Sequence, residues 1–365
     1  MKQVRGIRPI RFAILFLFVV APAAAARSDG IRTVVASNRD YVYAGRIDFS
    51  NRASPGFYWS GNSVTIGFSG HQLGVVLDAT GSNIYMDAII DGNDARPDVI
   101  HCRAGEHAYP IADDLSGGKH VVTIYRRVDP TYPVVRFAGI QVDRDATVFR
   151  PVLHHKLRIV YYGDSITSGY GVLSTTRSNE GAARYMDSYM AYPAVASRML
   201  QASYHVVSLS GIGIMKSWFP LTMPELYDRL VPRDPDSRWN FASWQPDIVV
   251  VNLLQNDFWL LPKEKHPPSG SEIVHAYMRF VESLRRHYPG ATIVCMLGNM
   301  DVTAAGSRWP GYVRTAVKTM QAEGDRKVHA LIVPFKRSPG HPNVAEQHAL
   351  AVALVGKIKA IESAH

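Results

Sequence analysis

Residues 157–169 are LRIVYYGDSITSG, an apolar run that leads directly into a turn of small residues. A continuous apolar run of this kind is typical of a strand buried on both faces of a parallel sheet. The small residues around Ser165 permit a tight turn that would expose its hydroxyl group at the end of the strand. A serine in this place is by itself most often a helix N-cap. A catalytic interpretation therefore depends on what else lies at the same edge of the sheet.

The chain beyond residue 157 alternates apolar strand-like runs with segments of helical spacing. Strands are expected at 157–162, 205–209, 248–254, 292–297 and 330–335, and helices at 188–201, 224–230, 272–288, 312–323 and 343–362. Such alternation predicts a parallel sheet with helices on both faces, a three-layer α/β/α domain over 151–365. Ligands of such sheets gather at the carboxyl ends of the strands.

The preceding part of the chain has a different period. Residues 63–68 and 73–77 alternate apolar and small or polar side chains, and β-rich runs follow at 83–90, 120–126 and 134–142. Turn signals such as Asp91-Gly92-Asn93-Asp94 and Gly117-Gly118 separate these runs. Short strands with regular punctuation predict an all-β sandwich or jelly roll over 27–150. A polar connection at 143–156 joins it to the second domain.

Three further strand ends carry residues suited to acyl chemistry. The second strand ends at Gly211, where a backbone N–H can approach a ligand closely, and the third at Asn256, an amide after a very apolar run. His341 lies between the last strand and the last helix. Each residue alone fits a turn or a solvated loop. Together with Ser165 at one sheet edge, they supply a nucleophile, a base and two oxyanion donors.

These residues resemble the four sequence blocks of the SGNH (GDSL) hydrolase superfamily. Gly163-Asp164-Ser165, Gly211, Asn256-Asp257 and His341-Pro342-Asn343 occur in the order of those blocks. The resemblance implies that Ser165 is the nucleophile and His341 the general base. It also implies an oxyanion hole made of the Ser165 and Gly211 N–H groups and the Asn256 side chain. The carboxylates of Asp164 and Asp257 are expected to hold loop N–H groups, because short acidic side chains commonly stabilise turns.

The N-terminal half resembles the β-sandwich domain that precedes the catalytic domain in carbohydrate esterase family 2. The segments that carry this likeness are Gly45-Arg46-Ile47, Trp59-Ser60-Gly61, Asp91-Gly92 and 115–120, LSGGKH. Members of that family remove acetyl groups from plant polysaccharides such as xylan and glucomannan. The resemblance implies that this chain is an acetylesterase acting on acetylated polysaccharide or oligosaccharide, without a cofactor.

The chain departs from the superfamily pattern at three places. Ser338 and Pro339 occupy the positions where an Asp usually precedes the catalytic histidine, so a Ser–His dyad without a local acid is expected. Some members of the resembled family place a backbone carbonyl on the imidazole instead, and the sequence leaves open which group orients His341. Leu254 stands where the third block usually begins with glycine. Gly340 stands where the family often has tryptophan, which predicts a more open slot with Trp218 or Trp259 as the sugar platform.

The N-terminus and the composition narrow the setting. Residues 1–26 combine four basic side chains, an apolar run and an alanine-rich site, the pattern of a signal peptide, with a retained membrane anchor as the alternative. The formal charge of +9 falls to +5 beyond that segment, and no aromatic-interleaved basic stripe indicates nucleic-acid binding. We therefore expect a secreted or periplasmic protein without stable membrane insertion.

Two cysteines, Cys102 and Cys295, are too few for a disulfide framework and are predicted to be buried and free. No CxxC or HExxH spacing predicts a metal site.

Other functions remain open on sequence alone. A secreted lipase, lysophospholipase or thioesterase on the same fold would need a long apolar acyl groove. An esterase acting on acetylated bacterial surface polysaccharide or peptidoglycan would share the same residues. A carbohydrate-binding protein with a degenerate site is the alternative outside enzymes, because the usual Asp is missing.

Overall fold

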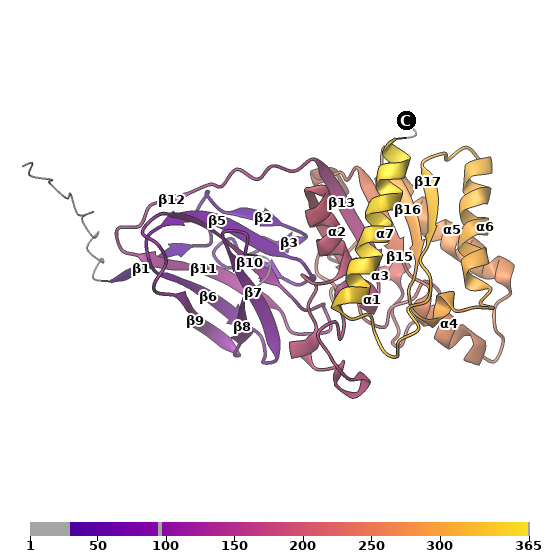
Figure 1. Cartoon of the computed structure of the whole chain (residues 1–365), viewed down its shortest axis with the longest axis horizontal. Coiled ribbons are helices and arrows are strands. Elements are labelled where there is room, and N and C mark those ends of the chain that lie inside the picture. The colour runs from indigo at the N-terminus through magenta and orange to yellow at the C-terminus, as the bar shows by residue number, and fades with distance from the viewer. Residues whose placement is uncertain (1–29, 94–96, 364–365) are drawn as a thin grey trace, which may run out of the picture.

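The computed structural model describes residues 30–93 and 97–363 and contains two packed units, a β-sandwich and an α/β domain (Figure 1). The predicted signal peptide and membrane-anchor alternative lie outside the described residues. Among the residues described, no helix has the length and apolar character needed to cross a membrane.

The N-terminal unit is a sandwich of two antiparallel sheets. In the first sheet β3, β4, β11, β6 and β9 are neighbours in that order and β1 pairs with β11, while in the second β12, β5, β10, β7 and β8 are neighbours and β2 pairs with β5. The strands of the first sheet are β1 (Ile31–Val35), β3 (Ile47–Asp48), β4 (Gly56–Phe57), β6 (Leu73–Ala79), β9 (Gly105–Ala112) and β11 (Val135–Asp143). Those of the second are β2 (Val42–Ala44), β5 (Ser63–Ser69), β7 (Ile84–Ile90), β8 (Asp98–Cys102), β10 (Lys119–Arg126) and β12 (Val148–Phe149). The apolar positions predicted to alternate along β6, namely Leu73, Val75 and Leu77, all lie in the core.

The C-terminal unit is built on a five-stranded parallel sheet with the order β14-β13-β15-β16-β17. Its strands are β13 (Leu157–Gly163), β14 (Ala202–Ser208), β15 (Ile248–Asn252), β16 (Thr292–Leu297) and β17 (Val328–Ile332). Helices α2 (Tyr192–Leu200) and α7 (Val344–Glu362) cover one face, and α5 (Gly270–His287) and α6 (Trp309–Ala322) cover the other (Figure 1). Ile159 and Tyr161 of β13 belong to the core under α2 and α7, whereas Val160 and Tyr162 belong to the opposite core. Both faces of the strand are buried, as the continuous apolar run predicts.

The predicted elements differ from the structure mainly at their ends. Helix α2 begins at Tyr192, four residues after the expected start, because Pro193 fits the first turn of a helix and Ala191 before it is extended. β17 begins at Val328, two residues earlier than expected. Helix α4 (Gln255–Leu260), directly after β15, was not predicted. Cys102 and Cys295 are free and buried, which confirms that prediction.

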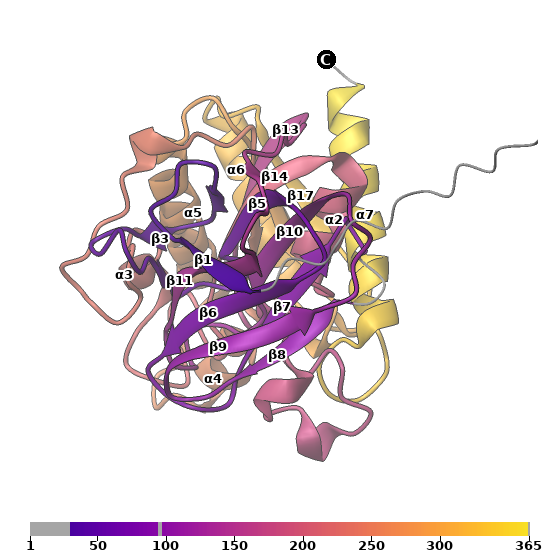
Figure 2. The ribbon, with the colours of Figure 1, turned by 90° about the vertical axis from the view of Figure 1, so that its left-hand side faces the viewer.

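A buried arginine of the sandwich anchors the two units to each other. Arg46 is 1% exposed, and its guanidinium donates to the carbonyl oxygens of Tyr227 and Arg229 at 2.7 and 2.8 Å. The Trp59 indole N–H likewise donates to the carbonyl oxygen of Leu230 at 2.7 Å. The sandwich thereby packs against the α/β domain, which lies behind it in Figure 2. These bonds satisfy backbone carbonyls that the interface would otherwise bury without partners.

A neutral buried histidine near this interface predicts acid sensitivity. Burial, reinforced by the charge of Arg46, lowers the pKa of His205 to about 3, and its ring stacks on Trp244 with centroids 3.8 Å apart. Because the folded pKa lies below the ordinary value, the unfolded chain binds the proton more readily between about pH 6.5 and pH 3. Stability should fall as the pH drops through that window, by at most about 1.4 kcal/mol per pH unit from this group.

The measurement is urea unfolding of the wild-type chain and of His205→Phe at pH 7 and pH 4.5. The variant keeps a ring against Trp244 but has no titrating nitrogen. We expect the wild-type chain to lose about 2–3 kcal/mol more than the variant between the two pH values. Equal losses in both proteins would exclude His205 as the source.

Candidate active site

Ser165 lies at the carboxyl end of β13, in a turn that its neighbours hold tightly. It begins the short helix α1 (Ser165–Ser168), and the Asp164 carboxylate before it accepts the N–H of Ile166 at 3.0 Å. A side chain at Gly163 would collide with Thr167, so glycine is required there. The Gln347 amide of α7 donates to the carbonyl oxygen of Ile166 at 2.9 Å. The serine is 6% exposed and rigidly supported.

His341 lies on the loop between β17 and α7, close to Ser165. Asn343 and Glu346 form a capping box that starts α7 directly after this loop. The Nε2 atom of His341 is 2.9 Å from the Ser165 Oγ atom. This distance is within the hydrogen-bond reach that a nucleophile and its general base require.

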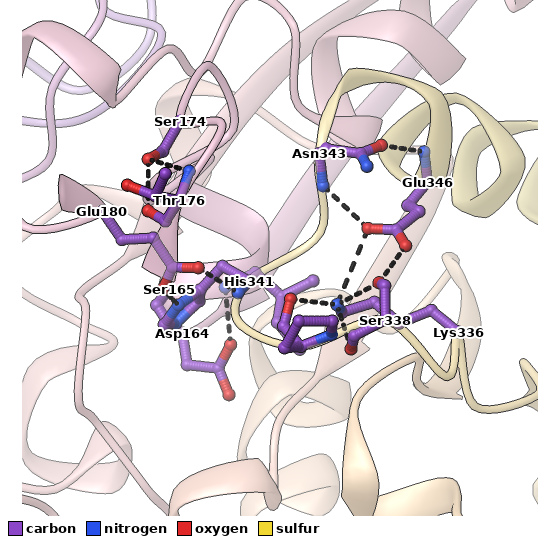
Figure 3. A network of polar contacts seen from close by, with 12 residues as sticks. Asp164, Ser165, Ser174, Thr176, Glu180, Lys336, Ser338, His341, Asn343 and Glu346 are labelled. Atoms are coloured by element: carbon purple, nitrogen blue, oxygen red, sulfur yellow. Dashed lines mark hydrogen bonds and ion pairs between the residues drawn. The ribbon is translucent and has the colours of Figure 1, made fainter. Parts of the chain in front are cut away.

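The carboxylate of Glu180 binds the other side of the imidazole (Figure 3). Its Oε2 atom is 2.8 Å from His341 Nδ1, and its Oε1 atom accepts the backbone N–H of His341 at 2.8 Å. The expectation of a Ser–His dyad without an acid is therefore wrong for the geometry of this site, because a carboxylate lies on the imidazole. The orienting group is an acidic side chain from a loop 161 residues earlier in the chain.

Two glycines make room for this carboxylate. Gly340 has φ +74°, and a Cβ atom there would overlap the Glu180 carboxyl group. Gly171 has φ +65°, and its Cβ would lie 2.8 Å from the Glu180 side chain. Glu180 fills the space that a side chain at position 340 would take, so the glycine makes room for the carboxylate, and a more open substrate slot stays a prediction.

Glu180 is held in its charged form. Partial burial by itself raises the pKa of this carboxyl group, but the hydrogen bonds and charge of His341, together with the charge of Lys336, outweigh burial and leave the pKa below its ordinary value. An ionised acceptor at Nδ1 favours the imidazole tautomer with its proton on Nδ1, which leaves Nε2 free to accept the serine proton.

A second cluster braces the loop that carries His341 (Figure 3). The Lys336 side chain is 3% exposed, and its ammonium group donates to the carbonyl oxygens of Ser338 and Pro339 at 2.8 and 3.2 Å. The Ser338 hydroxyl donates to the Glu346 carboxylate. Ser338 and Pro339, the positions where the superfamily usually has an Asp, thus hold the loop rather than the imidazole.

Two of the predicted oxyanion donors, Gly211 and Asn256, lie on segments that hydrogen bonds connect. Gly211 has φ +88° in the turn after β14, and among the residues described its N–H donates no hydrogen bond. The Asn256 amide donates to the carbonyl oxygen of Ile212 at 2.8 Å and lies 3.5 Å from the Asp164 carboxylate. Asn256 therefore connects the glycine turn to the serine turn.

Asp257 holds the segment that follows the glycine turn. Its carboxylate accepts the backbone N–H groups of three consecutive residues, Ile214, Met215 and Lys216, at 2.7–3.0 Å. Burial raises the pKa of Asp257, and burial raises the pKa of Asp164 to about 7. Both carboxylates accept loop N–H groups, as expected from the sequence.

Leu254 takes the backbone conformation that the usual glycine of the third block would take. It has φ +84°, a conformation that favours glycine, and it is 1% exposed within the apolar core. Burial of the leucine side chain offsets the backbone strain.

The two tryptophans that were candidate sugar platforms have different surroundings. Trp218 is 59% exposed, lies against Gly211, and donates its indole N–H to the Asn256 Oδ1 atom at 3.0 Å. Trp259 is partly buried against the core and donates to Asp301 at 2.8 Å. Trp218 alone combines exposure with contact to the proposed oxyanion donors.

The geometry defines a class of site: a serine in contact with a histidine, which is in contact with a carboxylate. Within residues 30–93 and 97–363, no cluster of three or more His, Cys, Asp or Glu side chains is placed to hold a metal ion. Such a constellation supports nucleophilic acyl transfer.

Comparisons with known proteins identify the family. Residues 161–352 match the GDSL-like lipase/acylhydrolase family, and residues 43–151 match the carbohydrate esterase 2 N-terminal domain. The chain belongs to the GDSL-like lipase/acylhydrolase family and combines its domain with that N-terminal domain. These matches confirm the family predicted from the sequence motifs and place the chain among the carboxylic ester hydrolases.

Individual relatives are similar over both domains. The chain is 30% identical to the cellulase/esterase CelE of Acetivibrio thermocellus over 88% of its own length, and it spans 39% of that protein. It is 24% identical to an acetylxylan esterase/glucomannan deacetylase of Cellvibrio japonicus, covering 90% of this chain and 91% of the relative. The structure of a family two carbohydrate esterase from Clostridium thermocellum in complex with cellohexaose superposes with a TM-score of 0.81 at 28% identity, covering 88% of this chain and 99% of that one.

Glu180 is the site residue that sequence reasoning missed. It lies outside the sequence blocks that carry Ser165 and His341, in a polar stretch without helical or strand period. The available signals were weak: Glu180 is the single acidic residue between Ser165 and Asp187, and Gly340 precedes the histidine.

Replacing Glu180 with glutamine should lower kcat/KM for an acetyl ester by about 10³- to 10⁴-fold. The amide can donate to Nδ1 and favour the wrong imidazole tautomer, which has an effect of this size in serine hydrolases. Steady-state kinetics with 4-nitrophenyl acetate measure the loss. The control is Glu272→Gln, which removes the charge of an exposed capping-box residue on α5. A loss below tenfold for Glu180→Gln would restore the dyad interpretation.

Proposed function

We propose that this protein is an exported serine esterase that removes acetyl groups from polysaccharides through Ser165, His341 and Glu180. The observation that carries the proposal is the continuous contact from Ser165 Oγ to His341 Nε2 at 2.9 Å and from His341 Nδ1 to Glu180 at 2.8 Å. No metal or organic cofactor is required by this chemistry.

The first half of the reaction transfers the acetyl group to the serine. His341 Nε2 removes the proton of Ser165 as Oγ forms a bond to the ester carbonyl carbon. The Ser165 and Gly211 N–H groups and the Asn256 amide stabilise the resulting oxyanion, and each such donor is typically worth about 3 kcal/mol of barrier. The carbon–oxygen bond to the sugar then breaks, and His341 returns its proton to the sugar oxygen.

The second half releases acetate. His341 removes a proton from water, which attacks the acetyl carbonyl carbon, and the same donors stabilise the second oxyanion. The bond between the acetyl carbon and Ser165 Oγ then breaks, and Oγ takes up the proton from His341. Glu180 stays ionised throughout and stabilises the imidazolium that forms twice per cycle.

The substrate class is inferred from the relatives together with Trp218. One relative is named a cellulase/esterase and another an acetylxylan esterase/glucomannan deacetylase. A related structure was determined in complex with cellohexaose. An exposed tryptophan beside the proposed oxyanion hole offers a flat apolar face of the kind that packs against a sugar ring. Acetylated xylan and glucomannan are therefore the proposed partners, and nucleic acid is not.

Export is proposed from the N-terminal pattern of basic residues, apolar run and small-residue site. The mature chain is then expected outside the cytoplasm, where acetylated polysaccharides are found.

The direct test is hydrolysis of 4-nitrophenyl acetate, butyrate and octanoate by residues 27–365. Acetate should be the preferred acyl group, and Ser165→Ala should lower its turnover by about 10³-fold or more, because removal of a catalytic serine has effects of this order or larger. Ser168→Ala is the matched control: Ser168 is on the same short helix, and its hydroxyl donates to Ser208 rather than to His341.

The outcomes separate the alternatives. A preference for octanoate would favour a lipase or lysophospholipase. Full activity in Ser165→Ala, or no turnover of any ester by a folded wild-type chain, would contradict the proposal, and the second result would favour a carbohydrate-binding protein.

Trp218 should have two separable effects. Trp218→Phe keeps an aromatic face but loses the N–H that orients Asn256, so kcat should fall by about tenfold equally on 4-nitrophenyl acetate and acetylated xylo-oligosaccharide. Trp218→Ala should in addition raise KM by up to about tenfold on the oligosaccharide only, because the sugar contact is lost. Wild-type kcat in Trp218→Phe would exclude the role of the indole N–H, and an unchanged oligosaccharide KM in Trp218→Ala would exclude the platform.

A further inference from the structure

A buried carboxylate of the sandwich domain reaches the turn that carries Gly211. Asp129 lies in the loop between β10 and β11 and is 0% exposed. Its Oδ2 atom accepts the backbone N–H of Ser210 at 2.8 Å. Ser210 lies two residues after the end of β14 in the α/β domain and directly precedes Gly211. The contact joins residues 81 positions apart across the boundary between the two units.

The carboxylate is itself fixed from the sandwich side. Its Oδ1 atom accepts the N–H of Thr131 at 3.0 Å and also the Thr131 hydroxyl. The carbonyl oxygen of Asp129 accepts the guanidinium of buried Arg126 at 3.1 Å. Asp129 therefore presents a rigid, charged acceptor, and hydrogen bonds to charged groups are stronger than those between neutral groups.

In the contacted turn, the orientation of the central peptide sets the direction of the Gly211 N–H. Leu209, Ser210, Gly211 and Ile212 form a four-residue turn closed by the Ile212 N–H on the Leu209 carbonyl oxygen at 3.2 Å. A positive φ at the third residue, here +88° at Gly211, is the mark of a type II turn. Types I and II differ by a flip of the central peptide, and that peptide contains the Gly211 N–H.

We propose that Asp129 is a positioning residue of the active site: by holding the Ser210 N–H, it fixes the Leu209–Ser210 peptide, the first peptide of the turn, and so anchors the turn in which the next peptide directs the Gly211 N–H toward the developing oxyanion. This inference rests on the esterase function proposed above. It makes the sandwich domain part of the catalytic geometry, since an oxyanion donor acts only when it is held in place before the reaction.

Other contacts show that the sandwich reaches the opposite side of the site as well. The Tyr132 hydroxyl donates to the carbonyl oxygen of Gly181, the residue after Glu180, at 3.1 Å. Arg127 pairs with Asp187 at the end of the same loop, at 3.3 Å. The loop from β10 to β11 thus contacts both segments, the one that supplies Gly211 and the one that supplies Glu180.

The test compares Asp129→Ala, Asp129→Asn and Asp143→Ala with the wild-type chain, using 4-nitrophenyl acetate. Asp143 is the matched control, because its buried carboxylate also accepts backbone N–H groups, those of His71 and Gln72, within the sandwich alone. Thermal unfolding of each variant establishes the temperature at which all are folded. Inhibition by phenylboronic acid, which forms a tetrahedral adduct with a catalytic serine, reports transition-state complementarity.

We expect Asp129→Ala to lower kcat by about 10- to 100-fold with KM within about threefold, and to weaken phenylboronic acid by a similar factor. Its pH profile should stay unchanged, because His341 and Glu180 are untouched. Asp129→Asn keeps an oxygen for the Ser210 N–H and should stay within about fivefold of the wild-type kcat. Asp143→Ala should lose stability but keep kcat within about twofold.

Wild-type kcat in folded Asp129→Ala would overturn the inference, as would equal losses of kcat in Asp129→Ala and Asp143→Ala. Ser165→Ala, measured beside them, separates this failure from failure of the proposed function. If Ser165→Ala abolishes turnover while Asp129→Ala does not reduce it, the esterase stands and the positioning role falls. If Ser165→Ala stays active, the esterase itself is contradicted.

Discussion

The imidazole of His341 is held on both sides, 2.9 Å from the Ser165 hydroxyl and 2.8 Å from the Glu180 carboxylate. The second carboxylate oxygen binds the backbone N–H of the same histidine, so ring and backbone are fixed by one side chain. This arrangement constrains the residues around it. Position 340 accepts only glycine because the carboxylate fills the space of a side chain there, and Gly171 lies against the same group.

The ionised state of Glu180 depends in turn on its surroundings. A half-buried carboxylate loses favourable hydration, and here two hydrogen bonds from His341 and the nearby Lys336 charge replace it. Lys336 is itself almost fully buried and satisfied by loop carbonyls and the Glu346 carboxylate. Two carboxylates and one ammonium therefore stabilise the loop and the base together, where a nearby acid would have done so in the usual pattern.

The fold and every residue of this site except Glu180 could be predicted because their signals are local. Periodicity located every strand of the parallel sheet, and the motifs at the ends of β13, β14 and β15 and before α7 predicted Ser165, Gly211, Asn256 and His341. Glu180 could not be found in this way, because its role depends on a loop folding back over 161 residues. The expected dyad failed for the same physical reason: a missing local acid does not exclude an acid supplied through tertiary structure.

Long-range contacts therefore complete what the local motifs begin. The serine turn is connected to the glycine turn by Asn256, the glycine turn to the sandwich by Asp129, and the glutamate loop to the sandwich by Tyr132. A donor displaced by about 1 Å can lose a hundredfold in rate, so these supports matter as much as the residues that touch substrate. Because two of the three supports come from the sandwich, the α/β domain cut out by itself would keep Ser165 and His341 in sequence but lose contacts that hold Gly211 and Glu180 in position.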